Sequence, residues 1–303
     1  MGKVAFVFPG QGSQFVGMGK DIYENNDLAR KEYDKIFKNL SFDLKTAMFD
    51  GPEELLKKTK YTQPAIVAMS LILDKLLKEK GIYPDFVAGH SVGEYSAIGS
   101  AEFLSLDETV KLTSFRGEAM NEIAEKVNGG MAAIIGMPSE KIIELLKTVT
   151  GVVEAVNFNE PKQTVIAGDK DSIEKSCELL KENGARRALL LPVSGPFHSS
   201  LMKPAGEKLK KEIETYEFKD TKIKLVANTT AEIISTGNEL KEEIYNQSFG
   251  PVRWVETIEK LKENGVETIY EIGPGKTLAG LIRKIDKNLK VVSINSLSAI
   301  DNL

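Results

Sequence analysis

The chain has 303 residues, a length typical of one large domain, or of one large domain that carries a smaller one. Hydrophobic residues make up 42% and charged residues 28%, an ordinary globular balance that excludes a disordered or fibrous protein. Forty lysines and arginines stand against 44 aspartates and glutamates; since the sequence also has no basic stripe, nucleic acid is not expected as a partner.

The first part of the chain alternates between short apolar runs and a segment of helical period. Residues 4–8 and 86–88 predict buried strands, because both runs are short and apolar. Between them, residues 62–80 carry apolar side chains at helical spacing. Strand, helix and strand in this order predict a parallel sheet with helices on its faces.

The middle of the chain has a different order of elements. The pattern predicts strand, helix, strand, strand, helix and strand at residues 131–136, 139–148, 152–156, 163–167, 170–183 and 188–192. The turn-rich residues 157–161 separate the two central strands. This β-α-β-β-α-β order is that of a ferredoxin-like unit. We therefore expect an inserted ferredoxin-like subdomain at residues 127–197.

The last part of the chain returns to the pattern of the first. Helices are predicted at residues 252–264 and 278–285, and strands at residues 268–272 and 291–294. Residues 1–126 and 198–303 are therefore expected to form one α/β core with a mostly parallel sheet, which the subdomain interrupts.

The most informative motif is Gly89-His-Ser-Val-Gly93, a G-x-S-x-G sequence between a predicted strand and a segment rich in small residues. A serine on such a strand-to-helix turn is presented as a nucleophile, and backbone N–H groups at the helix start stabilise developing negative charge. The motif therefore indicates Ser91 as a nucleophile on an α/β-hydrolase-like core.

A nucleophilic serine needs a base, and the chain has only two histidines. His90 adjoins Ser91, and neighbouring side chains on a tight turn point in different directions, so His90 is a poor proton acceptor. His198, on a loop just after the subdomain, is the candidate general base. No acidic third member is evident. Asp169 and Asp171 fall at a helix start, where capping is their expected task, and a backbone carbonyl can orient an imidazole equally well.

Two further segments have more than one interpretation. The loop Gly10-Gln-Gly-Ser-Gln14 is not a dinucleotide fingerprint, because Phe15 occupies the third glycine position. A backbone N–H of this loop can instead stabilise an oxyanion. Arg116 lies in a helical segment with no acidic residue three or four positions away, so its surroundings predict an exposed arginine.

The sequence carries no signal for export or membrane insertion. The apolar run at residues 4–8 is too short for a signal peptide. The longest uncharged stretches, such as residues 61–73, fall short of the roughly 18 apolar residues that span a bilayer. The single cysteine, Cys177, cannot form an internal disulfide, which fits a reducing compartment. We expect a cytoplasmic protein without membrane contact.

Five short motifs lie along nearly the whole chain. They are Gly10-Gln-Gly-Ser-Gln14, Gly89-His-Ser-Val-Gly-Glu94, Arg116-Gly117, Pro196-Phe-His198, and Gln247 followed by Pro251-Val-Arg-Trp254. The set, in this order, resembles the malonyl-CoA:acyl carrier protein transacylases and the acyltransferase domains of fatty acid and polyketide synthases. The resemblance implies a hydrolase-like core with a ferredoxin-like insertion.

The resemblance also implies how the catalytic groups are divided. Ser91 is the nucleophile that takes the acyl group, and His198 is its base and later its acid. Gln247 orients His198 through its main-chain carbonyl and replaces a triad carboxylate. Backbone N–H groups of Gln11 and Val92 form the oxyanion hole.

The substrate implied by the resemblance is malonyl-CoA. Arg116 holds its free carboxylate, since a guanidinium pairs bidentately with a carboxylate. Phe197 is typical of malonyl-selecting rather than methylmalonyl-selecting domains. The malonyl group passes through a malonyl-serine to the phosphopantetheine thiol of acyl carrier protein, for fatty acid synthesis, without a metal or redox cofactor. Two alternatives are a serine esterase or thioesterase with the same elbow, and a binding module without catalysis.

Overall fold

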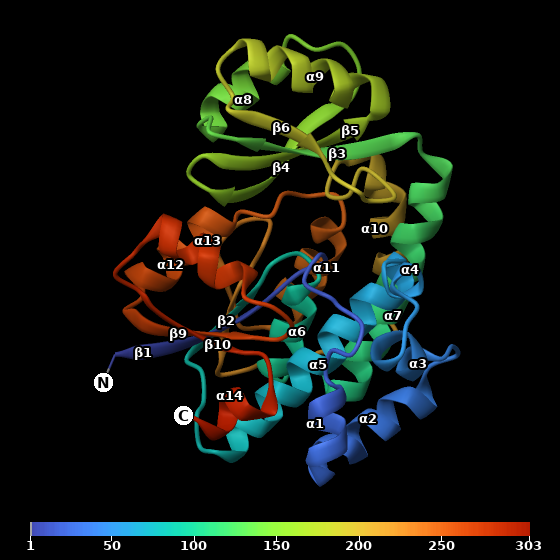
Figure 1. Cartoon of the computed structure of the whole chain (residues 1–303), viewed down its shortest axis with the longest axis vertical. Coiled ribbons are helices and arrows are strands. Elements are labelled where there is room, and N and C mark those ends of the chain that lie inside the picture. The colour runs from blue at the N-terminus through green and yellow to red at the C-terminus, as the bar shows by residue number, and fades with distance from the viewer. Residues whose placement is uncertain (1) are drawn as a thin grey trace.

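The structure, a computed structural model, describes residues 2–303 and contains two β-sheets with helices packed around them (Figure 1). The large sheet has six strands in the order β10-β9-β1-β2-β7-β8. These strands are β1 (Lys3–Phe8), β2 (Phe86–Gly89), β7 (Lys224–Val226), β8 (Ile233–Ile234), β9 (Val266–Ile272) and β10 (Lys290–Ile294). Only the β7–β8 pair is antiparallel among these described strands. The prediction of a mostly parallel sheet is confirmed.

Both faces of the large sheet are buried, because successive side chains of a strand point to opposite faces. Phe6 and Phe8 of β1 enter one core, whereas Ala5 and Val7 enter another. The helices of the first core are α1 (Lys20–Asn25), α2 (Asp27–Asn39), α3 (Leu44–Phe49), α4 (Glu53–Leu56), α5 (Thr59–Glu79), α6 (Gly93–Ser100), α7 (Leu106–Lys126), α10 (Lys203–Ile213), α11 (Gly237–Gln247) and α14 (Leu297–Asp301). Those of the second are α12 (Trp254–Glu263) and α13 (Thr277–Ile285).

The small sheet is antiparallel and lies above the large one in Figure 1. Its strands, in the order β4-β5-β3-β6, are β3 (Gly129–Ile135), β4 (Val153–Glu160), β5 (Gln163–Asp169) and β6 (Arg187–Leu190). One face packs on α8 (Ser139–Leu146) and α9 (Lys170–Glu182). The other packs on α7 and α10, with the 3₁₀ turn at Ser200–Met202 beside them. The ferredoxin-like assignment and the boundaries at residues 127 and 197 stay predictions.

The predicted elements differ from the observed ones mainly where a polar run continues a strand. Residues 157–160, predicted as a turn, belong to β4. The pairing of β4 with β5 shifts register twice along this run, and the Phe158 N–H donates to the Val252 carbonyl at 2.9 Å. These bonds satisfy the backbone of a sequence that reads as a turn. The pattern predicts no strand for β7 or β8, which are only three and two residues long.

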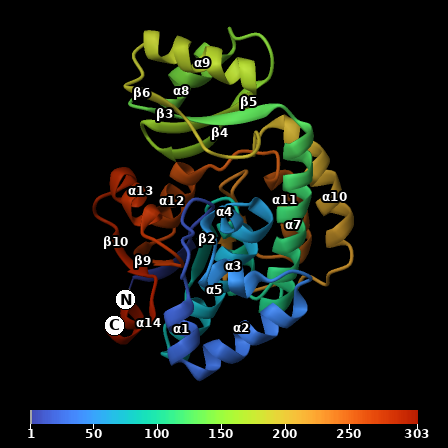
Figure 2. The ribbon, with the colours of Figure 1, turned by 45° about the vertical axis from the view of Figure 1, so that its right-hand side comes forward.

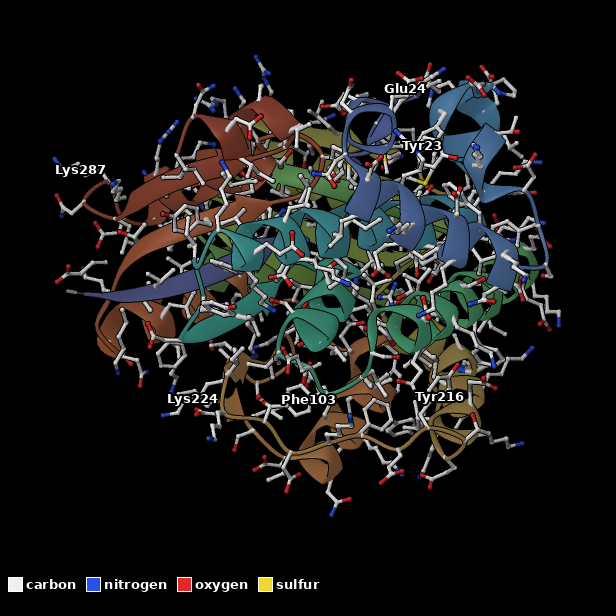
Figure 3. The ribbon with its side chains drawn as sticks, turned by 90° about the horizontal axis from the view of Figure 1, so that it is seen from below. Tyr23, Glu24, Phe103, Tyr216, Lys224 and Lys287 are labelled. Atoms are coloured by element: carbon white, nitrogen blue, oxygen red, sulfur yellow. The ribbon has the colours of Figure 1, made fainter. Side chains whose placement is uncertain are left out.

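The side of the molecule away from the small sheet carries charged side chains at its edge (Figure 3). Figure 3 shows this face from below, with Lys224 and Lys287 directed outward. Near α1 and α2, the Tyr23 and Tyr33 rings pack edge to face with centroids 6.0 Å apart. Within residues 2–303, no helix combines the length and the apolar character needed to cross a membrane.

The ends of β1 and β2 meet at the border between the two sheets. Phe8 pairs with Gly89 at the end of the β1–β2 register, so the loops that follow these strands leave the sheet side by side. Figure 2 shows α7 running from the core up to β3, where the chain enters the small sheet. Any group placed after β1 or β2 therefore lies in the space that the small sheet covers.

Candidate active site

Ser91 occupies a tight turn between β2 and α6. Its φ of 53° lies in the left-handed region, which is uncommon for a residue other than glycine. A Cβ on Gly89 would lie 1.9 Å from the backbone carbon of Gly93, and a Cβ on Gly93 would lie 2.1 Å from the Phe8 carbonyl oxygen. Both glycines of the motif are therefore required by the close approach of three backbone segments.

His198 lies beside Ser91, although 107 positions separate them in the chain. Its Nε2 is 2.7 Å from the Ser91 Oγ. Its Nδ1 is 3.0 Å from the Gln247 carbonyl oxygen and 3.1 Å from that of Gly250. Since carbonyl oxygens only accept hydrogen bonds, Nδ1 carries the proton and Nε2 is left to accept one from the serine hydroxyl.

The surroundings of His198 keep its ring neutral. The residue is 3% exposed and also has a left-handed backbone, with φ 68°. Burial, followed by the positive charge of Arg116 and by repulsion from the His90 ring when that ring is protonated, lowers the pKa of His198 to about 3. A neutral imidazole is the form that can take a proton from a serine. Two left-handed residues in direct contact are typical of a functional site.

Gln247 joins three groups at the centre of the site. Its main-chain oxygen accepts from His198, and its side-chain Nε2 donates to the Ser91 carbonyl at 2.6 Å. Its Oε1 accepts from the Arg116 Nη2 at 2.8 Å. The residue is fully buried at the end of α11. The nucleophile, the histidine and the arginine are thus held by one amide side chain and its backbone.

Arg116 is completely buried, so the exposed position that its sequence surroundings predict is wrong. Its guanidinium carbon lies 5.2 Å from the centroid of the Tyr95 ring. Within residues 2–303, its Nε and Nη1 have no hydrogen-bond partner. Leaving such donors unpaired in a buried site is costly, and a carboxylate satisfies a guanidinium bidentately. The arrangement therefore fits an anionic ligand.

The loop after β1 lies against the Ser91 turn. A Cβ on Gly10 would lie 2.5 Å from the His90 carbonyl oxygen, so the two backbones are in direct contact. Gln11 follows Gly10, and Val92 forms the N-cap of α6. In the described part of the chain, neither the Gln11 nor the Val92 backbone N–H donates a hydrogen bond. Two free backbone donors therefore lie beside the turn.

The other candidates from the sequence lie outside this network. Asp169 caps α9: its carboxylate accepts from the Ser172 N–H at 3.0 Å and from the Val152 N–H at 2.7 Å. The expected capping role is therefore confirmed. The His90 ring contacts the Asn159 Oδ1 through its Nε2, at 2.7 Å, rather than Ser91.

Sequence reasoning misses Asn228, a fully buried residue beneath the turn. Its Oδ1 accepts from the Ser91 N–H at 2.8 Å, and its Nδ2 donates to the Gly89 carbonyl at 2.6 Å. Its own N–H donates to Glu94, a motif residue to which the sequence assigns no task. One available signal is the run Asn228-Thr-Thr directly after an apolar segment, because the carboxyl ends of parallel strands commonly carry site residues.

Comparison with known proteins agrees with this geometry. The sequence model of the acyl transferase domain matches residues 5–297. The chain belongs to the acyl transferase family. This match spans both sheets of the acyl transferase and every residue of the site described above.

Three similar proteins show how far the likeness of this acyl transferase extends. The malonyl CoA-acyl carrier protein transacylase of Bacillus subtilis strain 168 is 43% identical, over 99% of this chain and 96% of that protein. The acyl-carrier-protein S-malonyltransferase of Burkholderia pseudomallei 1710b is 42% identical and has a TM-score of 0.95. The match covers 99% of this chain and 98% of that one. A malonyl-transacylase in complex with its holo type II PKS acyl-carrier protein is 38% identical and has a TM-score of 0.95. This match also covers 99% of this chain and 98% of that one.

Proposed function

We propose that this acyl transferase moves a malonyl group from CoA to the phosphopantetheine thiol of acyl carrier protein, for fatty acid synthesis, through a malonyl ester of Ser91. Arg116 carries the proposal, because it is a buried cation with two unpaired donor atoms, joined to Ser91 through Gln247. A malonyl thioester brings a free carboxylate to such a group. The names of the B. subtilis and B. pseudomallei relatives describe the same transfer.

The first half of the reaction loads the enzyme. The His198 Nε2 takes the Ser91 hydroxyl proton while Oγ attacks the thioester carbonyl carbon. When the resulting tetrahedral intermediate collapses, the carbon–sulfur bond breaks and the sulfur takes the proton from His198. CoA leaves as its thiol, and malonyl-Ser91 and a neutral His198 remain.

The second half repeats these steps in reverse. The phosphopantetheine thiol gives its proton to His198, and its sulfur attacks the carbonyl carbon of malonyl-Ser91. The carbon–Oγ bond then breaks, and the Ser91 Oγ recovers the proton from His198. Malonyl carrier protein leaves and the enzyme returns to its starting state, so neither half consumes or produces a net proton.

Both halves pass through an oxyanion, which the Gln11 and Val92 N–H groups stabilise in this proposal. These donors belong to backbone that the structure holds against the turn, so they need no reorganisation during the reaction. A single oxyanion-hole donor is typically worth ~10²–10³ in rate. Gln247 and Gly250 supply the carbonyls that orient His198, in place of a triad carboxylate.

A serine esterase or thioesterase shares the elbow but has no need of a buried arginine with open donor atoms. A binding module has no need of a serine hydroxyl 2.7 Å from a neutral imidazole. No feature of the site favours either alternative.

The proposal also places the enzyme in the cytoplasm, in keeping with the free, buried thiol of Cys177.

Intact-mass spectrometry after incubation with malonyl-CoA tests the function. We expect one malonyl adduct, mapped to Ser91, which disappears when holo acyl carrier protein is added and the carrier gains the group. The Ser91→Ala variant should form no adduct. Free malonate released without the carrier would support hydrolysis instead, and undiminished transfer by Ser91→Ala would exclude the serine mechanism.

A further inference from the structure

We propose that Asn228 is a positioning residue of the transfer reaction: it holds Ser91 in its left-handed conformation, and the buried carboxyls of Glu94 and Glu243 hold Asn228. The inference rests on the proposed function, since it concerns how the nucleophile of that reaction is aimed. The residues come from three separate elements, because Asn228 follows β7, Glu94 lies on α6 and Glu243 lies on α11.

The Asn228 amide bridges both sides of the turn. Its Oδ1 accepts from the Ser91 N–H, and its Nδ2 donates to the Gly89 carbonyl. A residue in the left-handed turn between a strand and a helix takes part in the backbone hydrogen bonds of neither element. Its N–H therefore needs a partner from another part of the chain. One planar amide fixes the backbone on both sides of His90, and with it the direction of the Ser91 Oγ.

Two carboxyl groups fix the main chain that carries this amide. The Asn228 N–H donates to the Glu94 Oε1 at 2.8 Å, and the next N–H, of Thr229, donates to the Glu243 Oε1 at 2.9 Å. The Thr229 hydroxyl also donates to the Glu243 Oε2. On the other side, the Arg253 N–H donates to the Asn228 carbonyl at 2.9 Å. The position of Asn228 is therefore determined by α6, by α11 and by the segment before α12.

The charge state of the two carboxyls suits this task. Burial raises the pKa of both, and the negative charge of Glu243 raises the pKa of Glu94 further, whereas the Arg116 charge lowers it. Two adjacent buried carboxyls titrate as a pair, and holding one proton avoids two negative charges beneath Ser91. A carboxyl with one proton still has a free oxygen to accept the Asn228 N–H.

The first test is Asn228→Ala, with steady-state kcat and KM for malonyl-CoA and the single-turnover acylation rate all measured per folded enzyme. We expect kcat to fall by ~10–100-fold, because a misplacement of about 1 Å costs on this order. KM for malonyl-CoA should change less than about threefold, since Arg116 and Gln247 keep their contacts. The control is Asn264→Ala, which removes a similar bond, from Nδ2 to the Lys260 carbonyl at 2.8 Å. Asn264 precedes β9, an inner strand that lies on the other side of β1 and β2 from β7, and its variant should keep wild-type kinetics.

The second test is the pH dependence of acylation by the Asn228→Asp variant. If Asn228 had only a structural role, this pH dependence would match that of the wild type. An aspartate keeps the shape and the acceptor for the Ser91 N–H, but its ionised form has no donor for the Gly89 carbonyl. The groups facing it are Glu94 on α6, Glu243 on α11 through Thr229, and Arg253 before α12. We expect a raised pKa, because two buried carboxyls face the new one. The variant-to-wild-type ratio of acylation rates should therefore rise as the pH is lowered from about 8 to about 6.

The outcomes separate this inference from the function on which it rests. A wild-type enzyme that forms no malonyl-Ser91 would disprove the proposed function, whatever the variants do. With wild-type acylation intact, Asn228→Ala acylating within twofold of the wild-type rate per folded enzyme overturns the positioning role. If Asn228→Ala does not fold, Asn228→Asp decides: a rate ratio that rises at low pH supports the role, and a ratio independent of pH overturns it.

Discussion

At the residue scale, hydrogen bonds engage some polar atoms of each site residue and leave specific other atoms free for the substrate or the reaction. Two carbonyl oxygens accept hydrogen bonds from the protonated Nδ1 of His198, so only Nε2 can take a proton from Ser91. Gln247 uses both ends of its amide, and Arg116 keeps two donor atoms open in a buried setting. The chemistry therefore depends on the direction of hydrogen bonds as much as on distance.

Removing the Arg116 guanidinium should change the choice of substrate. Truncating one partner of a buried charge pair costs roughly 2–5 kcal/mol, so Arg116→Ala should lose malonyl transfer by a factor of about 30 to a few thousand. Acetyl transfer should be spared or improved, because acetyl-CoA has no free carboxylate. The measurement is kcat/KM for both thioesters. An equal loss with both would remove Arg116 from the specificity role.

The low pKa of His198 should appear in the pH profile of acylation. With a folded pKa of about 3 against an ordinary 6.5, the base stays neutral, and kcat/KM should remain flat from about pH 8 down to about pH 5. Between these two pKa values, the His198 side chain binds a proton in the unfolded chain but not in the folded one. The free energy of unfolding therefore rises with pH in this range, and the contribution of His198 reaches its full value above about pH 6.5. Stopped-flow acylation across this range is the measurement. A falling limb centred near pH 6.5 would contradict the expectation.

At the scale of elements, the site depends on how closely β1, β2 and α6 approach each other. The turn between β2 and α6 fits only because two of its residues lack a side chain. The loop after β1 then lies directly on the turn, with Gly10, the residue before Gln11, against the His90 backbone. Short parallel strands that end together thus supply the nucleophile and the candidate oxyanion donors from separate segments.

Adding one methyl group to Gly93 should separate these elements. Its Cβ would lie 2.1 Å from the Phe8 carbonyl oxygen, a backbone atom of a central strand that cannot easily move. We expect Gly93→Ala to lower the free energy of unfolding by more than about 1 kcal/mol and to abolish acylation. Urea denaturation and intact-mass acylation measure the two effects.

Gly280 offers a matched control in another helix. It lies on α13, and a Cβ there would meet nothing within 4 Å. Gly280→Ala should therefore stabilise the protein by about 0.5–1 kcal/mol and leave acylation unchanged. If both variants behave alike, close approach at the turn is not what Gly93 provides.

At the scale of the whole molecule, the small sheet is bonded to the core beside the site. The Val252 N–H donates to the Val156 carbonyl at 2.7 Å, and the His90 ring contacts Asn159 on β4. The His90 ring also packs edge to face with the Trp254 ring, with centroids 5.7 Å apart. The residue next to the nucleophile therefore joins the two sheets.

Cutting this link should weaken the whole protein rather than the small sheet alone. Asn159→Ala leaves the His90 Nε2 without its partner, which should cost about 1–3 kcal/mol of the free energy of unfolding. Urea denaturation, followed by two probes, should still show one cooperative transition. The control Asn121→Ala removes an exposed bond to Glu125 and should change stability by less than about 0.5 kcal/mol. Separate transitions of the two sheets would contradict this expectation.

The sequence by itself determined the alternation of strands and helices and singled out Ser91 and His198. Apolar periodicity is local, so β1, β2, α5 and the strands of the small sheet are predictable within a few residues. The G-x-S-x-G motif is local too, because its glycines are required by the tight turn that these five residues form. The scarcity of histidine then left His198 as the one plausible partner for Ser91.

Only the tertiary structure decided what surrounds these two residues. Arg116 reads as exposed because its neighbours in sequence offer no partner, yet packing buries it and its partner Gln247 lies 131 positions away. Asn228 lies 137 positions from Ser91 and has no motif of its own. The reason is physical: burial and hydrogen-bond partners arise from segments distant in the chain, and no local pattern of residue types records which of them will meet.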